Sequence, residues 1–465
     1  MVPYSFMLKP TIFREYDIRG IADPAHPDFE LTDSGVELLG RALGTYLQRH
    51  AGPKINLGRD TRLSSPRLRD ALMRGLKSSG CHVTDLGVVP TPIVYYSQFH
   101  LKADGAVMIT GSHNPAEFNG FKTVCGASTI HGSAIQDLRR MMESGDLARG
   151  EGSETTADCV TPYVDEIAAQ FHFPRRVKVV IDAGNGTGGP VMHRLLEHLN
   201  ADATEMYFDM DGRFLNHHPD PTVPHNLEAL IAKVRETGAE LGIAFDGDTD
   251  RIGAVDETGE VVYGDQLMIV YAREILSRKP GATFIGEVKC SQQMYDDLAA
   301  RGGNPIMWKT GHSLIKAKMK ETHAELAGEM SGHMFFGDRY YGFDDALYAA
   351  CRLMEIVSNS GHALSHQLAD LPKTVSTPEI RFDCPDELKF DVVRRAAEAL
   401  KGRYKTIDVD GVRAIFPHGW GLVRASNTQP VLVMRFEATT PALLAQYRAE
   451  VEDVVSAARA AANSA

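Results

Sequence analysis

Short apolar runs alternate along the chain with segments whose apolar residues recur at helical spacing. Runs of this kind, bounded by turn residues, are typical of buried parallel strands, and the longer segments between them are typical of helices. Strands that alternate with helices indicate parallel pairing with right-handed crossovers, so we expect an α/β fold. The predicted strands include residues 54–57, 81–86, 106–109, 177–181 and 283–288, and the predicted helices include 31–50, 65–79 and 266–276.

This rhythm is interrupted twice. Residues 142–158 are rich in Gly, Ser, Thr and Glu and predict a linker. After residue 372 the pattern changes and predicts a separate small α+β domain, with a strand at 377–382, a helix at 386–400 and strands near 406 and 412. Because domains average about 150 residues, the length of 465 residues suggests three or four of them.

Composition narrows the class of protein. With 43% apolar and 24% charged residues and no apolar segment long enough to cross a bilayer, the chain reads as a water-soluble globular protein. No secretory signal is visible, so we expect a cytoplasmic location. The six cysteines lie far apart without a CxxC pair, which argues against a zinc site or a disulfide framework. A net charge of -12 opposes nonspecific nucleic-acid binding, so an anionic substrate requires a local concentration of Arg and Lys.

The first chemical motif follows the apolar run that ends at Thr110. Ser112 and His113 follow this run and lie in a turn that Gly111, Asn114 and Pro115 predict. Ligands of parallel sheets bind beyond the carboxyl ends of the strands, so we predict that Ser112 is the reacting residue. A Ser-His pair in a loop is often turn chemistry alone, and that alternative stays open at this point.

The second motif is the alternating series Asp246, Asp248 and Asp250, again after an apolar run. In a curved loop three carboxylates can converge on one hard divalent cation. A calcium loop of the EF-hand type fails, because Arg251 occupies the position that requires glycine and the flanks are strand-like. Magnesium is the better prediction, and a plain acidic turn is the alternative.

Two further motifs carry groups suited to a sugar phosphate. Glu329, Ser331 and His333 alternate after a short apolar run, and a carboxylate next to a hydroxyl can bind adjacent sugar hydroxyls. A second cluster between two apolar runs can hold a phosphate dianion and consists of Arg424, Ser426, Asn427 and Thr428. A core-edge loop and a polar hairpin turn are the respective alternatives.

Two segments are more ambiguous. Residues 12–20 bring Tyr16 and two arginines together and can bind an anion, but these residues alone favour an edge strand with solvated arginines. Residues 184–189 fit the pattern GxGxxG between a predicted strand and a helix, with Asp209 and Asp211 near the expected distance onward. A dinucleotide-binding site is therefore one interpretation, and a strand-to-helix turn with Pro190 in the first helical position is the other.

Together these motifs resemble one family, the α-D-phosphohexomutases, and within it the bacterial phosphomannomutase/phosphoglucomutase branch. The resemblance extends over nearly the whole chain and rests on YDIRG at 16–20, TGSHNP at 110–115, DGDTDR at 246–251, GEMSGH at 328–333 and RASNTQP at 424–430. It implies three related α/β domains with mixed sheets and a smaller C-terminal α+β domain around a central cleft. The implied domains are 1–153 with the phosphoserine loop, 154–257 with the metal loop, 258–370 with the sugar-binding loop and 371–465 with the phosphate-binding loop.

The resemblance also implies a role for each motif residue. Ser112 is the implied phosphoserine, and its phosphate is expected to share Mg²⁺ with Asp246, Asp248 and Asp250. The residues implied around the transferring group are Arg19, His113, Lys122, Arg251 and His333. The residues implied to bind substrate are Tyr16, Lys289, His312, Glu329 and Ser331 in the cleft and Arg424, Ser426, Asn427 and Thr428 around the phosphate that is not transferred. His333 is our first choice of general base, and Lys122 is the rival.

The implied activity is reversible transfer of phosphate between the 1- and 6-positions of mannose or glucose phosphates. Glucose 1,6-bisphosphate or mannose 1,6-bisphosphate is the expected intermediate and activator. We expect hexose phosphates as the only partners, with no nucleic acid and no membrane, and a monomer. The alternatives are a phosphoglucosamine mutase, a metal-dependent phosphatase-like enzyme, a dinucleotide-binding α/β enzyme and a non-catalytic sugar-phosphate-binding protein.

Overall fold

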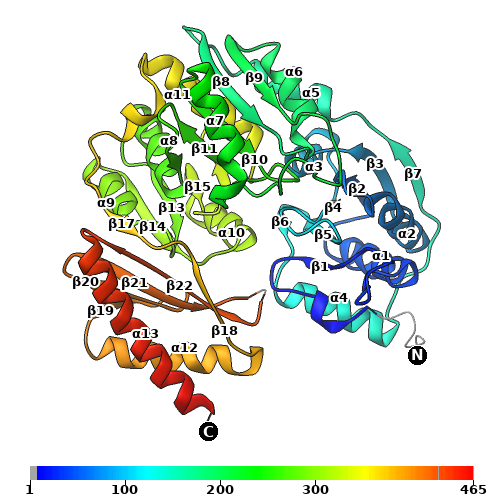
Figure 1. The fold of residues 1–465 in the computed structure, drawn as a ribbon. Helices are drawn as coiled ribbons and strands as arrows, with labels where there is room; N and C mark the ends of the chain where they lie inside the picture. The colour runs from blue at the N-terminus through cyan, green and yellow to red at the C-terminus, as the bar shows by residue number, and fades with distance from the viewer. Residues whose placement is uncertain (1–7, 428, 464–465) are drawn as a thin grey trace.

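The computed structural model describes residues 8–427 and 429–463, which form four sheets arranged in an arc (Figure 1). The N-terminal sheet has the order β1-β5-β4-β2-β3-β7, with β6 on β5. Its centre is parallel, and β5 turns back antiparallel beside β4. The elements are η2 (Pro10–Ile12), β1 (Ile18–Ile21), α1 (Asp33–His50), β2 (Lys54–Arg59), α2 (Ser65–Ser78), β3 (His82–Val88), α3 (Thr91–Leu101), β4 (Gly105–Ile109), β5 (Phe118–Cys125), β6 (Ser128–Thr129), α4 (Ser133–Ser144) and β7 (Ser153–Thr156).

The second sheet has the order β12-β11-β10-β8-β9. Strands β9, β8 and β10 are parallel, β11 is antiparallel to β10, and β12 is antiparallel to β11. Its elements are α5 (Val160–Ala168), β8 (Val177–Asp182), α6 (Gly188–Leu196), β9 (Ala201–Met206), η3 (Pro224–Leu227), α7 (Glu228–Thr237), β10 (Leu241–Phe245), β11 (Ile252–Asp256) and β12 (Val261–Val262).

The third sheet has the order β14-β13-β15-β16, with three parallel strands followed by an antiparallel one. Its elements are α8 (Gly264–Arg278), β13 (Thr283–Glu287), α9 (Gln292–Ala300), β14 (Asn304–Trp308), α10 (His312–Thr322), β15 (Leu326–Gly328), β16 (Met334–Phe336), α11 (Ala346–Ser360) and η4 (Leu364–Leu368). The prediction of related α/β domains with mixed sheets is confirmed.

The fourth sheet is antiparallel throughout, in the order β17-β22-β21-β20-β19 with β18 on β22. Helices α12 (Asp386–Lys401) and α13 (Pro441–Asn463) accompany it. Its strands are β17 (Val375–Ser376), β18 (Ile380–Asp383), β19 (Lys405–Ile407), β20 (Val412–Phe416), β21 (Gly419–Ala425) and β22 (Val431–Ala438). This sheet is the predicted small α+β domain.

One recurring feature positions the motifs. In each of the first three sheets the last parallel strand turns back through a loop into an antiparallel neighbour, as β4-β5, β10-β11 and β15-β16. These three loops carry Ser112, the three aspartates and Glu329 with His333. In the fourth sheet the hairpin β21-β22 carries Asn427. The structure therefore repeats one arrangement that the sequence showed only as apolar runs ending in polar residues.

The apolar cores divide the molecule unequally. One continuous cluster contains buried side chains of α3 from the first unit together with α5, α6, α8 and α11. The C-terminal unit has its own cluster, and a small group of Val288, Trp420 and Leu422 joins it to the third sheet. Arg413 stacks on Trp420 at 3.7 Å and donates hydrogen bonds to the carbonyl oxygens of Val288 and Cys290. Arg435 adds an ion pair with Asp265 at 3.4 Å, so buried arginines and one small apolar group attach the fourth unit to the third.

Two expectations differ from the structure. Residues 153–156, predicted as linker, form β7, because their backbone pairs in parallel with β3 although all four side chains are exposed. The expected domain boundary at 153/154 therefore cuts a strand. The expected boundary at 257/258 separates β11 from β12, which pair with each other.

In the described part of the chain no helix is both long and apolar enough to cross a membrane.

Candidate active site

The loop between β4 and β5 presents Ser112 with an unusual backbone. The φ angle of Ser112 is 49°, in the left-handed region that non-glycine residues seldom adopt. The residue is 1% exposed, its backbone amide donates to Thr110 Oγ1 at 2.8 Å, and its Oγ lies 3.1 Å from His113 Nδ1. Its Oγ also donates to Asp246 Oδ2 at 2.8 Å, across 134 positions of sequence. The first and second motifs therefore meet.

A buried arginine that the sequence analysis did not single out holds this loop. Arg62 is 1% exposed and donates to the carbonyl oxygens of Ser112 at 2.8 Å, Asn114 at 2.6 Å and Pro115 at 2.5 Å. Asp60 accepts from the Gly111 amide at 3.0 Å and pairs with Arg62. The only sequence signal was a pair of charged residues after β2, which looks like an ordinary strand end.

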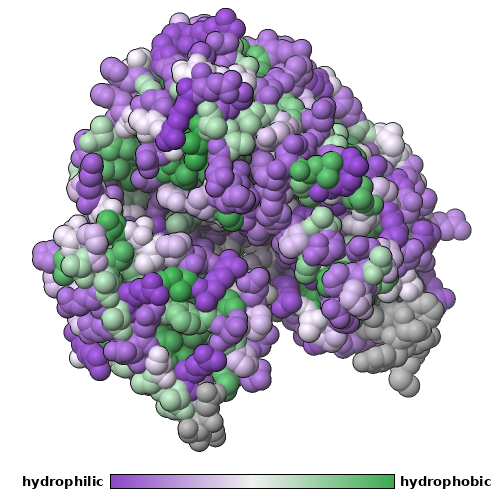
Figure 2. Space-filling model, in the orientation of Figure 1, coloured by the Kyte–Doolittle hydropathy of each residue, from purple (hydrophilic) through white to green (hydrophobic). Residues whose placement is uncertain are grey.

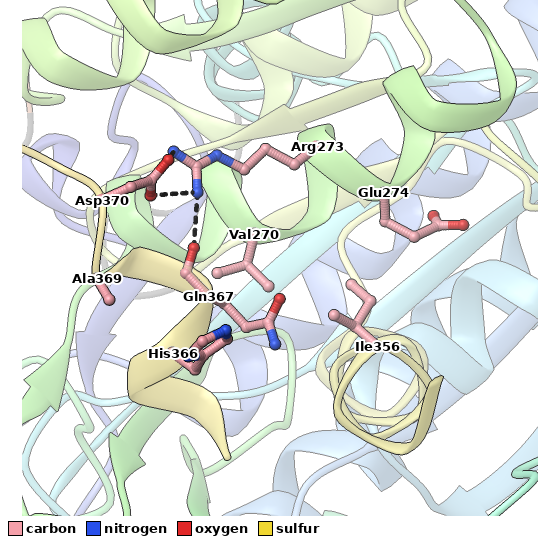
Figure 3. A pocket seen from close by; sticks show the side chains of 8 residues that line it. All are labelled: Val270, Arg273, Glu274, Ile356, His366, Gln367, Ala369 and Asp370. Atoms are coloured by element: carbon pink, nitrogen blue, oxygen red, sulfur yellow. Dashed lines mark hydrogen bonds and ion pairs between the residues drawn. The ribbon is translucent and has the colours of Figure 1, made fainter. Parts of the chain in front are cut away.

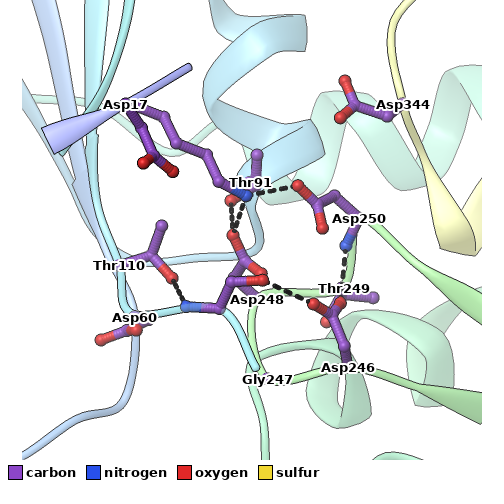
Figure 4. Close-up of polar contacts among 12 residues, drawn as sticks. Asp17, Asp60, Thr91, Thr110, Asp246, Gly247, Asp248, Thr249, Asp250 and Asp344 are labelled. Atoms are coloured by element: carbon purple, nitrogen blue, oxygen red, sulfur yellow. Dashed lines mark hydrogen bonds and ion pairs between the residues drawn. The ribbon is translucent and has the colours of Figure 1, made fainter. Parts of the chain in front are cut away.

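The three aspartates lie at the junction of the first two units (Figure 4). Asp246, Asp248 and Asp250 are all completely buried. Lys122 Nζ from β5 lies 2.6 Å from Asp248 Oδ2 and also binds Asp250 Oδ2. Thr91 Oγ1, at the start of α3, donates to Asp248 Oδ2 at 2.5 Å. Thr91 is a second residue that sequence reasoning missed, because its partner lies 157 positions away.

The donor set fits a divalent cation. Ligand oxygens of the three aspartates lie within 4.8 Å of one another, and the Oδ1 atoms of Asp248 and Asp250 are buried without a hydrogen-bond partner in the described part of the chain. Burial and the neighbouring charge of Asp248 raise the pKa of Asp246 well above its ordinary value. Unpartnered buried carboxylate oxygens are costly, and carboxylates are the ligands that hard cations prefer.

The β15-β16 loop reaches the same place from the third unit. His333 Nδ1 lies 2.9 Å from Glu329 Oε2, and its Nε2 lies 3.4 Å from Asp250 Oδ1 and 3.3 Å from Arg251 Nε. Burial opposes the charge of this imidazole, but Asp250 and Glu329 outweigh it and raise the pKa of His333 to about 9. Burial likewise opposes the Glu329 charge, but His333 lowers the pKa of Glu329 to about 2.

The other histidines and cations surround Ser112. Burial, together with Arg251 and Arg19, holds the pKa of His113 well below its ordinary value, so this imidazole is neutral. Arg19 pairs with Asp17 at 2.7 Å and donates to the Gly111 carbonyl oxygen at 2.6 Å. Burial opposes the charge of Lys122, but Asp248 and Asp250 raise its pKa. A neutral imidazole and two cations thus lie beside the serine hydroxyl.

Tyr16 connects the first unit to the third and fourth. Its hydroxyl donates to the Thr310 carbonyl oxygen at 2.8 Å and accepts from Asn427 Nδ2 at 2.6 Å. Its ring contacts that of His312 edge-on with centroids 6.4 Å apart, and His312 stacks on His333 at 5.8 Å. Through Tyr16, these contacts connect the β21-β22 hairpin of the fourth unit to His312 and His333.

The β21-β22 hairpin, which carries the predicted phosphate-binding residues, has polar contacts of its own. Arg424 is 5% exposed and lies 3.0 Å from Asp410 Oδ2, which also accepts from the Thr310 amide at 3.1 Å. Lys289, at the end of β13, pairs with Glu379 at 3.2 Å. Ser426 lies with Asn427 in the β21-β22 hairpin, and Ser331 lies with His333 in the β15-β16 loop. Thr428 lies outside the described residues.

The glycine-rich turn at 184–189 does not form a dinucleotide cradle. The amides of Asn185, Gly186 and Thr187 already donate to the carbonyl oxygens of Tyr207, Ala183 and Gly247. A Cβ on Gly186 would come 2.7 Å from the Gly247 oxygen, and one on Gly189 would collide with the Phe208 backbone. The glycines therefore allow close packing against the aspartate loop, and the amides of the turn before α6 are already used within the protein.

The surface of the protein contains hollows that could admit a ligand. The face in Figure 2 is hollowed near its middle, where the lobes of the molecule meet. A separate hollow of about 480 Å³ lies between α8, α11 and η4 (Figure 3). Arg273, its cation, is already bound to Asp297, Asp370 and the Gln367 carbonyl oxygen. None of the predicted site residues lines this second hollow, so we assign it no function.

Comparison with known proteins agrees with this geometry. Four models of the phosphoglucomutase/phosphomannomutase family match, for domain I at residues 10–149, domain II at 161–259, domain III at 263–375 and the C-terminal domain at 379–454. The chain belongs to the phosphoglucomutase/phosphomannomutase family. The predictions of its family, its four-part fold and its isomerase class are confirmed.

Relatives in the phosphoglucomutase/phosphomannomutase family cover almost the whole chain. The phosphomannomutase/phosphoglucomutase of Pseudomonas aeruginosa is 46% identical and covers 93% of both chains. The phosphoglucomutase of Neisseria gonorrhoeae is 43% identical over 96% of both. A crystal structure of a family protein from Burkholderia thailandensis superposes with a TM-score of 0.90 at 40% identity, over 97% of this chain and 98% of that one. An N-acetylphosphoglucosamine mutase of Aspergillus fumigatus, at 16% identity and a TM-score of 0.63, shares the fold alone.

Proposed function

We propose that the chain interconverts the 1- and 6-phosphates of mannose or glucose through a phosphoserine at Ser112 and a hexose 1,6-bisphosphate. The observation that carries this proposal is the contact between Ser112 Oγ and Asp246 Oδ2 at 2.8 Å, beside the two aspartates that Lys122 binds. Phosphoryl transfer requires positioning and neutralisation of the oxygens more than covalent chemistry by the protein. The names of the relatives favour mannose and glucose over glucosamine.

The proposed roles follow from the contacts. Lys122, Arg19 and Arg251 neutralise the oxygens of the group in transfer, because Lys122 binds Asp248, Arg19 binds the Gly111 carbonyl oxygen before Ser112, and the Arg251 guanidinium lies 3.3 Å from His333. In each half-reaction an oxygen of the sugar forms a bond to phosphorus, the bond from phosphorus to the departing oxygen breaks, and the hydroxyl proton passes to a base of the protein. The other phosphate of the bisphosphate then returns to Ser112 by the same steps in reverse.

Substrate contacts come from the other two loops. Glu329 and Ser331 bind sugar hydroxyls, with His312 and Lys289 beside them. Arg424, Ser426, Asn427 and Thr428 hold the phosphate that stays, and Tyr16 supports this clamp through Asn427. Because the clamp has to accept either end of the sugar, a polar loop suits the task.

We propose Mg²⁺ as the cation, held by Asp246, Asp248, Asp250 and a phosphate oxygen on Ser112. When bound, it supplies charge stabilisation to the transferring phosphoryl group. His333 stays the proposed general base with Lys122 as the rival. Because Asp250 is the group that most raises the pKa of His333, neutralisation of the Asp250 charge moves this imidazole toward its ordinary pKa and frees it to accept a proton.

The remaining assignments are also proposals. We move two domain boundaries to follow the sheets, giving four domains that end near residues 156, 262, 370 and the C-terminus. Glucose or mannose 1,6-bisphosphate is the proposed activator, because the serine needs a phosphoryl donor before its first turnover. A monomer in the cytoplasm remains our expectation.

One experiment separates the mutase from a sugar-phosphate-binding protein. The purified chain is incubated with glucose 1,6-bisphosphate, and its intact mass and peptide masses are recorded, followed by a coupled assay on mannose 1-phosphate, glucose 1-phosphate and glucosamine 1-phosphate. We expect one added phosphate on Ser112 and turnover of the first two sugars. Binding of hexose phosphate without phosphorylation of Ser112 and without turnover would refute the proposal.

A further inference from the structure

A cavity of about 540 Å³ lies between the first and third units, and none of the predicted site residues lines it. Its walls come from α3 and the β5-β6 turn of the first unit and from α10 and residues 337–343 of the third. Helix α10 and strand β6 contact each other and lie side by side in Figure 1. The volume falls in the range of sites that bind small organic molecules. We call this space the interface cavity.

One side of the interface cavity is an aromatic wall, which consists of Phe99, Tyr341 and Phe343. The ring centroids of Phe99 and Tyr341 are 4.5 Å apart, and the rings of Tyr341 and Phe343 are nearly parallel with centroids 6.0 Å apart. Phe99 is 50% exposed, although phenylalanine is among the residues most often buried. Aromatic rings pair favourably in offset or edge-on arrangements, so this wall suits a planar aromatic ligand.

Two buried hydroxyl groups among the lining residues lack a partner. Tyr95 and Ser313 are 3% and 2% exposed, and both line the interface cavity. Neither Tyr95 Oη nor Ser313 Oγ has a hydrogen-bond partner in the part of the chain that the structure describes. Buried polar groups are nearly always satisfied in proteins, so two such hydroxyls on one cavity indicate a polar group of a ligand.

The charged side chains of the interface cavity are both cations. Lys316 and Lys320 line it, and no Asp or Glu of the described residues does. Lys316 Nζ lies 4.2 Å from the centroid of the Tyr95 ring and 3.0 Å from Asp344 Oδ1, so its charge is balanced. Lys320 is exposed and has no ion pair within residues 8–427 and 429–463. The uncompensated positive charge favours a negatively charged ligand.

We propose that the interface cavity binds a small aromatic anion, whose ring lies along the aromatic wall and whose acidic group pairs with Lys320. A polar group at the inner end of the ligand binds the hydroxyls of Tyr95 and Ser313. A sugar phosphate fits less well, because most of its hydroxyls would face apolar and aromatic side chains without a hydrogen-bond partner.

The interface cavity is connected to the candidate active site through Lys316. The partner of Lys316 is Asp344, whose Oδ2 lies 3.9 Å from His312 Nδ1 and 4.0 Å from His333 Nε2. An occupant that contacts Lys316 therefore acts on both histidines through one ion pair. This part of the inference rests on the proposed function: the ligand is an effector that lowers turnover without occupying the substrate site.

The test measures binding separately from activity. The probe is anilinonaphthalene sulfonate, an aromatic anion, and it is compared with its neutral analogue phenylnaphthylamine by fluorescence titration of the full chain. Ala317→Trp fills the interface cavity from α10 and should weaken binding of both probes about tenfold or more, because overfilled sites lose affinity. Ala299→Trp, exposed on α9, is the matched control and should bind both probes like the parent.

The charge of the ligand is tested with Lys320→Gln. This variant should weaken binding of the sulfonate about threefold, since ion pairs at a surface are weak, and should leave binding of the neutral analogue unchanged. Lys405→Gln, exposed on β19, alters the net charge equally and is the control. Excess glucose 6-phosphate should not displace either probe, because no predicted substrate-binding residue lines the interface cavity.

Several outcomes would overturn the proposal. Sulfonate binding that is unchanged in Ala317→Trp would mean that the probe binds elsewhere, and displacement by glucose 6-phosphate would place it in the substrate site. Equal loss of both probes in Lys320→Gln would contradict the selection of an anion. Each variant is checked by circular dichroism, and Ala127→Trp, which fills the cavity from the β5-β6 turn, is the second variant if Ala317→Trp does not fold.

The effector role has its own measurement. Under the proposed function, saturating sulfonate should lower the turnover of glucose 1-phosphate by the parent but not by Ala317→Trp. Binding in the interface cavity without any change in turnover would refute the effector role. A chain that binds the probe there but shows no mutase activity would refute the proposed function alone.

Discussion

The two ends of the candidate site are built differently. The serine end is the region around Ser112 and the three aspartates. Three loops meet there, from sheets that share one continuous apolar core. Buried contacts of Arg62, Thr91 and Lys122 hold these loops in place. The clamp end is the β21-β22 hairpin with Arg424, and it lies in a unit that has its own apolar core. Arg424 pairs there with the carboxylate of Asp410, which a bound phosphate would replace under the proposed function. Under the proposed function, this difference means that the chemical step is preorganised, whereas the binding of the distant phosphate exchanges one anionic partner of Arg424 for another.

The sharpest way to test this division is to remove the serine hydroxyl alone. Ser112→Ala should lower turnover of hexose phosphates by about 10⁴-fold or more, because no phosphoryl group can be carried, as in other enzymes that lose their nucleophile. Binding of glucose 6-phosphate, measured by calorimetry, should change little because the clamp is intact. Ser144→Ala at the exposed end of α4 is the control. Retained turnover would contradict a phosphoserine at this position.

Loss of one of the three aspartates should lower the activity, and the size of this loss should depend on the Mg²⁺ concentration. Asp248→Asn is expected to lower kcat by about 10²–10³-fold, the usual cost of losing an electrostatic stabiliser, and to raise the Mg²⁺ concentration needed for half-maximal activity. The exposed Asp209→Asn serves as the control. If both variants respond to Mg²⁺ like the parent, the acidic loop is not the metal site.

At the clamp end the expected effect is smaller and falls on binding. Arg424→Lys keeps the charge but loses the planar guanidinium, so KM should rise about 10–100-fold, corresponding to about 1.5–3 kcal/mol for a hydrogen bond to a charged group. The value of kcat should change less. Arg394→Lys, exposed on α12, is the control. A fall in kcat at constant KM would show that the two ends are not separable in the way described.

The smallest expected effect concerns the contact between the ends. Tyr16→Phe removes the hydrogen bonds to the Thr310 carbonyl oxygen and Asn427, which contribute about 1 kcal/mol each at most. KM is expected to rise about fivefold with little change in the melting temperature. Tyr404→Phe, within the fourth unit, is the control. An unchanged KM would mean that Tyr16 does not support the clamp.

Local sequence patterns predicted the loops but not their supports. Ser112, Asp246 and His333 each follow an apolar run, and that local pattern identified three of the hairpin loops correctly. The partners of these loops were not predictable, because Arg62 and Thr91 act over 50 and 157 positions and carry no local signal. The exposed strand β7 was missed for a similar reason, since its backbone is held by β3 and its side chains resemble those of a linker.

The left-handed backbone of Ser112 has a consequence for the catalytic cycle. Arg62 grips main-chain oxygens of this loop and none of its side chains, so the path of the loop is set independently of what Oγ carries. The phosphoryl group that we propose for Ser112 can therefore arrive and depart in every round without the turn refolding around it. The energy of that repeated swap is confined to side chains and counter-ions, which rearrange far faster than backbone.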